Sequence, residues 1–121
     1  MQSKVEPTQV GYDIVITGVK PIPKQRPRFG QGRVFTPAAT RTYEDILGWR
    51  FRQAAKAPLL GPIRVAINFE TSSRADVDNL AKAVLDAGNG ILYRDDSQVV
   101  SLVISKVKSA NEVIHVVLEE L

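Results

Sequence analysis

The sequence contains no cysteine, so neither a disulfide framework nor a thiolate zinc site can form, and a reducing compartment is expected. No apolar run approaches the length of a membrane span, and the first residues lack the apolar core of a signal peptide. The one histidine, His115, lies in a segment of alternating faces, and the sequence suggests neither a Ser–His–acid triad nor a glycine-rich phosphate loop. We therefore expect a cytoplasmic protein with no membrane contact, no organic cofactor and a structural or surface role for His115.

Charge, in contrast, is plentiful and unevenly distributed along the chain. Residues 20–56 contain nine basic side chains against two acidic ones, whereas residues 76–96 contain five acidic side chains against two basic ones. This separation favours a partner that carries phosphates, together with a distinct acidic pocket. A solvated basic face explains the first segment equally well by composition alone.

The length and composition predict one globular domain over residues 1–121, with residues 1–10 frayed. Prolines and glycines place residues 21–32 in an extended loop. Hydrophobic periodicity and capping residues predict strands at 13–17, 33–35 and 63–70, helices from Thr36 to about Ala57 and from about Asp78 to Ala87, and strands at 99–107 and 112–118 joined as a hairpin. The fold class is therefore mixed α/β (α+β), with one mixed β-sheet packed by two helices.

Two aspartates stand at the predicted start of the second helix. Asp76 and Asp78 are two residues apart, and in an extended segment such residues point to the same side, so both carboxylates can face one ion. Asp96 lies beyond the helix, where a return loop brings the chain back alongside the start of that helix. Two or three carboxylates with open positions suit Mg²⁺, which keeps several waters and takes phosphate oxygens from a substrate. We expect these three side chains to bind Mg²⁺, with Mn²⁺ as a substitute.

Lys82 follows Asp78 by one helical turn and rises from the same helix face, where it could hold a scissile phosphate. Asp86 lies a further turn along and is placed to orient Lys82, and Asp95 adjoins Asp96. Each has a structural alternative: Asp78 as an N-cap, Lys82 in a surface ladder of charges, and Asp95 in a turn. An Asp-x-Asp pair alone is weak evidence for a functional site. Its combination with the lysine and the later Asp-Asp pair favours such a site. An EF-hand is excluded because alanine occupies its sixth position.

These residues resemble the RusA family of Holliday junction resolvases, which are small homodimeric endonucleases of phages and bacteria. The shared pattern is Asp76-Val-Asp78-Asn79-Leu80-x-Lys82, followed by Asp86, a glycine-containing turn and Asp95-Asp96-x-Gln98-Val99. Upstream, Lys24-x-Arg26-Pro27-Arg28 and Phe35-Thr36-Pro37 also resemble segments of one branch of the family.

The resemblance implies that Asp76, Asp78 and Asp96 bind magnesium and that Lys82 is needed for cleavage. It further implies a homodimer with one active site per subunit, which cuts four-way DNA junctions by paired symmetric nicks. One departure from the family is Ala75, which stands where some members carry a basic residue, with Arg74 one position earlier.

Basic side chains are expected to hold backbone phosphates of branched DNA without reading bases, so that affinity falls steeply with salt. The candidates are Lys24, Arg26, Arg28, Arg33, Arg41 and Arg74.

Two other classes of function fit parts of the pattern. A non-catalytic DNA-binding or scaffolding protein would use the same carboxylates as caps and salt bridges. A metal-dependent enzyme acting on nucleotides or sugar phosphates would show little preference for long DNA.

Overall fold

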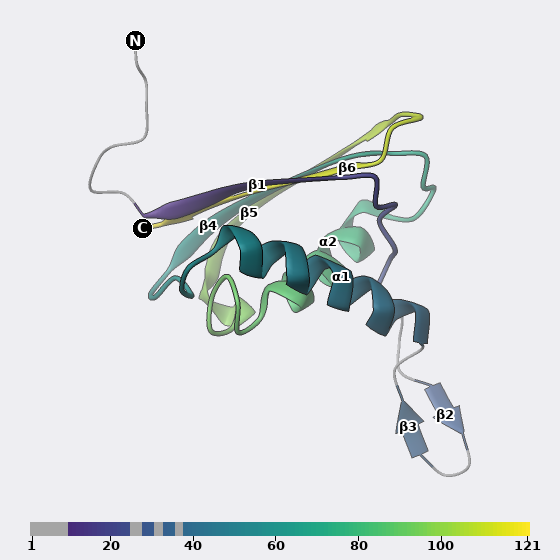
Figure 1. Cartoon of the computed structure of the whole chain (residues 1–121), viewed down its shortest axis with the longest axis horizontal. Helices are drawn as coiled ribbons and strands as arrows, with labels where there is room; N and C mark the ends of the chain where they lie inside the picture. Colours follow the sequence, from purple (N-terminus) through teal and green to yellow (C-terminus); the bar gives the residue numbers. More distant parts are fainter. Residues whose placement is uncertain (1–9, 25–27, 31–32, 36–37) are drawn as a thin grey trace.

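The computed structural model of the chain describes residues 10–24, 28–30, 33–35 and 38–121. Its main element is a four-stranded sheet with the strand order β1-β6-β4-β5 (Figure 1). The strands are β1 (Gly11–Thr17), β4 (Ile63–Thr71), β5 (Val99–Lys108) and β6 (Val113–Glu120). β4 pairs in parallel with β5 and antiparallel with β6, which pairs antiparallel with β1. The sheet is therefore mixed.

Two helices, α1 (Ala38–Ala54) and α2 (Val77–Gly88), cover one face of this sheet (Figure 1). Alternate residues of β4 point into the core beneath them, because successive side chains of a strand leave opposite faces of the sheet. The larger core side chains of these three elements are Ile63, Val65, Ile67 and Phe69 of β4, Tyr43, Leu47 and Phe51 of α1, and Leu80 and Val84 of α2. The prediction of one mixed sheet packed by two helices is confirmed.

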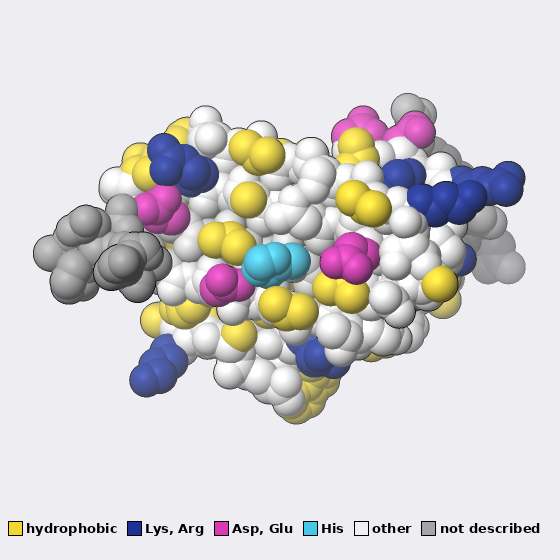
Figure 2. All heavy atoms as spheres, turned by 90° about the horizontal axis from the view of Figure 1, so that it is seen from above, with side chains coloured by type: hydrophobic (Ala, Val, Ile, Leu, Met, Phe, Trp, Pro, Cys, Tyr) yellow, Lys and Arg dark blue, Asp and Glu magenta, His cyan; other side chains and the backbone are white. Residues whose placement is uncertain are grey.

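The opposite face of the sheet, seen in Figure 2, carries no helix in the described part of the chain. Arg64 pairs there with Glu119 at 3.0 Å, and the Nε2 atom of His115 lies 2.6 Å from a carboxylate oxygen of Asp13. Hydrophobic side chains are interspersed among these polar groups (Figure 2). His115 thus lies on the far side of the sheet from the helices, bonded to a neighbouring strand.

The predicted hairpin between the last two strands is wrong. β4 lies between β5 and β6 and pairs with both, so the two strands that are adjacent in sequence do not pair with each other. The turn that joins them crosses the end of β4, where the N–H of Ser109 donates to the carbonyl of Thr71 at 3.0 Å. Glu112 also accepts hydrogen bonds there from the hydroxyls of Thr71 and Ser72.

A small second sheet interrupts the segment predicted as an extended loop. β2 (Arg28–Gly30) and β3 (Arg33–Phe35) form a two-stranded antiparallel unit that lies apart from the main sheet (Figure 1). Arg28 is therefore on a strand. The short strand predicted at 33–35 is confirmed. The predicted fraying of residues 1–10 (apart from residue 10) and the predicted helix cap at Thr36 lie outside the described residues. No helix in the described ranges is long and apolar enough to cross a membrane.

Candidate active site

The chain enters α2 from the end of β4 through a short bonded turn. The N–H of Ala75 donates to the hydroxyl of Ser73 at 3.2 Å, and the N–H of Ser73 donates to the hydroxyl of Thr71 at 3.0 Å. Lys106, on the neighbouring strand β5, donates its ammonium to the carbonyl of Ala75 at 2.6 Å. These bonds fix the backbone immediately before Asp76.

Asp76 and Asp78 open the helix with carboxylates that have no partner in the described part of the chain. Asp76 is the N-cap residue, because its backbone is extended and its carbonyl accepts the N–H of Leu80 at 3.1 Å, but its side chain makes no capping hydrogen bond. Asp78 follows in the first turn, so the alternative that it caps the helix is wrong. Both side chains are exposed. They are therefore accessible to a ligand from solution.

The donor chemistry of these two side chains fits a hard divalent cation, which takes carboxylate oxygens and retains waters. As the side chains stand, no group of three His, Asp or Glu residues within the described ranges converges to hold an ion. Asp96, the third expected ligand, is instead 3.7 Å from the ammonium of Lys82. A metal ion bound by all three carboxylates therefore requires side-chain rotation.

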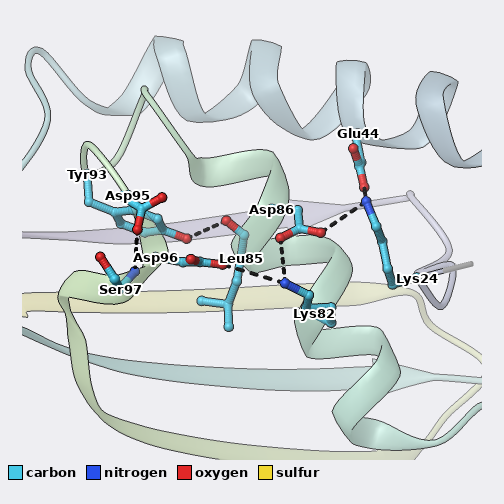
Figure 3. Close-up of polar contacts among 9 residues, drawn as sticks. All are labelled: Lys24, Glu44, Lys82, Leu85, Asp86, Tyr93, Asp95, Asp96 and Ser97. Atoms are coloured by element: carbon cyan, nitrogen blue, oxygen red, sulfur yellow. Dashed lines mark hydrogen bonds and ion pairs between the residues drawn. The ribbon is translucent and has the colours of Figure 1, made fainter. Parts of the chain in front are cut away.

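Lys82 belongs to a row of alternating charges that crosses from α1 to the segment after α2 (Figure 3). Its ammonium lies 3.0 Å from Oδ1 of Asp86 and 3.7 Å from Oδ2 of Asp96. The other oxygen of Asp86 lies 3.0 Å from the ammonium of Lys24, which also donates to Glu44 at 2.9 Å. This charge row consists of Glu44, Lys24, Asp86, Lys82 and Asp96. Asp86 is therefore in contact with Lys82, and its role in orienting that lysine stays a prediction.

Both lysines of the charge row are held in the protonated form. The hydrogen bond to Asp86 is the main cause that raises the pKa of Lys82, and the charges of Asp86 and Asp96 add to it. For Lys24, burial acts to lower the pKa, but the hydrogen bonds to Glu44 and Asp86 together outweigh it and the pKa is raised. Lys82 is therefore a fixed cation at neutral pH and cannot serve as a general base.

Tyr93 ties the segment that carries Asp96 to α2. Its buried hydroxyl donates to the carbonyl of Leu85 at 2.6 Å (Figure 3). Burial, followed by the charge of Asp96, raises the pKa of this phenol, so it remains a hydrogen-bond donor. A Cβ atom on Gly88 would stand 2.8 Å from the same hydroxyl, so the close approach requires glycine there.

Gln98 and Asp95 organise the turn around Asp96. The side-chain oxygen of Gln98 accepts the N–H groups of Arg94 and Asp95 at 2.8 and 3.0 Å, and its amide donates to the carbonyl of Leu59 at 3.0 Å. Asp95 caps the short helix η1 (Asp96–Gln98) by accepting the N–H of Ser97 at 2.9 Å, and bonds to Ser97 lower the pKa of its carboxyl. Asp95 thus makes the contacts expected of a residue that stabilises a turn, which was the structural alternative for this position.

The sequence matches the family of RusA endodeoxyribonucleases over residues 18–119, which is most of the chain. The chain belongs to the RusA family. The family is described as one of endodeoxyribonucleases. A 49-residue stretch, 40% of this chain, is also 45% identical to an uncharacterized protein, YqaN, of Bacillus subtilis (strain 168). That stretch covers 34% of the length of YqaN, so the two proteins are compared over about a third of that relative.

In this RusA protein the six expected DNA-binding residues are differently placed. Arg41 is exposed on α1, and Arg74 is exposed in the turn before Asp76. Arg28 and Arg33 lie on β2 and β3, and Arg26 is outside the described residues. The ammonium of Lys24 lies between two carboxylates.

Sequence reasoning on this RusA chain did not foresee Glu44, Tyr93 or the bonding of Lys24. Glu44 and Lys24 are 20 residues apart, on different elements, and no local spacing connects them. Tyr93 carried only a general signal, since a buried tyrosine usually finds a hydrogen-bond partner for its hydroxyl.

Proposed function

We propose that this protein is a magnesium-dependent endonuclease that resolves four-way DNA junctions by paired symmetric nicks, acting as a homodimer. The observation that carries this proposal is the start of α2, where Asp76 and Asp78 expose carboxylates that have no partner among the described residues, and where Lys82 follows Asp78 by one turn. Family membership supports the substrate class. Two-fold pairing of subunits suits a junction with near two-fold symmetry, because each subunit then cuts one of two equivalent strands.

Asp76, Asp78 and Asp96 would hold the metal ion. A bound Mg²⁺ supplies an activated water and neutralises charge on the phosphate oxygens. Asp96 would turn from Lys82 toward the ion, which frees the ammonium of Lys82 on that side. Lys82, still held by Asp86 at 3.0 Å, would then stabilise the negative charge that grows on the scissile phosphate.

The decisive experiment incubates the protein with a synthetic four-way junction and a linear duplex of matching sequence, with Mg²⁺ or with chelator. We expect nicks at symmetric positions in two opposed strands of the junction, only with Mg²⁺, and an intact duplex. Asp76→Asn should bind the junction and fail to cut it. Glu70→Gln, an exposed acid on β4, is the matched control and should cut normally.

A non-catalytic DNA-binding protein is the second candidate. It is favoured by the charge row, since Lys82 is already paired with two carboxylates, and by the capping bond of Asp95. In that case the junction is bound equally with Mg²⁺ or chelator, no strand is nicked, and Asp76→Asn changes nothing. Nicking that persists in Asp76→Asn would instead overturn the assignment of the site.

A further inference from the structure

Lys24 connects α1 to the helix of the candidate active site. Its ammonium lies 2.9 Å from Glu44 on α1 and 3.0 Å from Asp86 on α2, and its side chain is only 28% exposed. Its backbone N–H donates to the carbonyl of Asn79 at 3.0 Å, in the first part of α2. Both the main chain and the side chain of Lys24 are thus bonded to the helix that carries Lys82.

Asp86 is the residue through which Lys24 reaches Lys82. One carboxylate oxygen contacts each lysine at 3.0 Å, and the side chain is 17% exposed. A carboxylate whose two oxygens are bound to different cations on opposite sides cannot rotate without breaking one ion pair. The orientation of Asp86, and with it the place of the ammonium of Lys82, therefore depends on Lys24.

The balance of charges along the row also makes the position of the Lys82 ammonium depend on Lys24. Asp86 divides its attraction between two ammonium groups. Without Lys24 its full negative charge would act on Lys82 alone, and Glu44 would be left without its cation. Lys82 would then be drawn more strongly toward Asp86 and would be less available to a phosphate.

We propose that Lys24 is a positioning residue that sets the ammonium of Lys82 through Asp86, with Glu44 holding Lys24 in place, and that it is not a contact to the DNA backbone. This inference rests on the proposed nuclease function for its effect on cleavage. Its structural part, the dependence of Lys82 on Lys24, stands apart from that function.

The first test measures single-turnover cleavage of a saturating junction and junction affinity for wild type, Lys24→Met, Lys24→Arg and Lys108→Met. Lys108 is an exposed lysine at the end of β5 outside the charge row, so Lys108→Met is the control for the loss of one positive charge. We expect Lys24→Met to lower the cleavage rate by about 10-fold to 100-fold, which is the usual effect of removing a residue that orients a functional side chain. The junction affinity of Lys24→Met should be no weaker than that of Lys108→Met. Lys24→Arg should restore most of the rate, because a guanidinium can bond both carboxylates.

A phosphate contact gives the reverse pattern. Lys24→Met would then weaken binding, reduce the salt dependence of binding by about one counterion, and leave the saturated cleavage rate unchanged. That result would overturn the proposal.

The second test does not require cleavage. Lysine-selective ¹H–¹⁵N NMR records the ammonium signal of Lys82, assigned from its loss in Lys82→Arg. We expect this signal to shift in Lys24→Met, to be close to wild type in Lys24→Arg and to be unmoved in Lys108→Met. An unmoved signal in Lys24→Met contradicts the proposal even in a protein that cuts junctions. A shifted signal in a protein that cuts nothing overturns the proposed function and leaves the coupling of the two lysines established.

Discussion

Two aspartates of this protein occupy helix-capping positions, and they use their carboxylates differently. Asp95 accepts the N–H of Ser97 and closes the first turn of η1, whereas Asp76 stands at the start of α2 without a capping hydrogen bond. A capping side chain typically stabilises a helix by about 1 kcal/mol, so a helix that leaves this interaction unmade gives up stability at that end. A missing stabilising contact of this kind is common where the side chain binds a ligand instead.

This contrast predicts that stability and activity separate at the two residues. Asp76→Ala should leave the midpoint of urea unfolding nearly unchanged and abolish junction cleavage. Asp95→Ala should lower the midpoint, because it removes a formed cap, and should cut at a reduced rate through looser placement of Asp96. Equilibrium unfolding and cleavage assays on both variants check this. A fall in stability at Asp76 as large as at Asp95 would show that the carboxylate of Asp76 is structural.

At the scale of elements, the connection between β5 and β6 is fastened to β4 by one carboxylate. Glu112 accepts hydrogen bonds from the hydroxyls of Thr71 and Ser72 at 2.5 and 2.6 Å and from the N–H of Ser72 at 3.2 Å. These bonds, from Ser72 first and Thr71 second, lower the pKa of Glu112 from its ordinary value of 4.5. Because Thr71 and Ser72 also begin the turn that leads from β4 to Asp76, the same carboxylate supports the backbone before the candidate active site.

A lowered folded-state pKa stabilises the protein while the carboxylate is charged. The contribution is complete above the ordinary pKa of 4.5 and is lost as the pH falls through the lowered value in the folded state. We therefore expect Glu112→Gln to lower the melting temperature at pH 7, with a difference from wild type that shrinks as the pH falls below about 4.5. Thermal unfolding at a series of pH values measures this. Glu70→Gln is the control, and a difference from wild type that is independent of pH would contradict the assignment.

The same elements show what the sequence could and could not predict. The strict alternation of β4 and the apolar spacing of both helices predicted those elements, because burial on one face leaves a local period. The pairing of β5 was mispredicted as a hairpin with β6, because strand partners depend on distant residues. Asp76, Asp78 and Lys82 were identified by spacing along one helix, whereas the bond between Lys24 and Glu44 joins separate elements and leaves no local pattern.

For the molecule as a whole, binding to DNA should depend on charge more than on base sequence. Phosphate contacts release counterions, so affinity falls linearly with salt on logarithmic axes. Arg74 is exposed beside Asp76, whereas Arg64 lies on the uncovered face of the sheet and pairs with Glu119. Arg74→Gln should therefore reduce the salt slope by about one, and Arg64→Gln should leave it unchanged. Junction affinity measured at several salt concentrations decides this, and equal effects of the two variants would place the DNA elsewhere.

The strand order also dictates when the protein can first work. β6, the last strand of this sheet to be synthesised, lies between β1 and β4, and Gly11 pairs with Glu119, more than a hundred residues later. A chain still emerging from the ribosome therefore cannot close its sheet, because the strand that joins its early and middle parts does not yet exist. Contacts of such long range also make folding slow. One hydrogen-bonding edge of β4 therefore stays unpaired until β6 has been made, and the fold that places the candidate active site is complete only then.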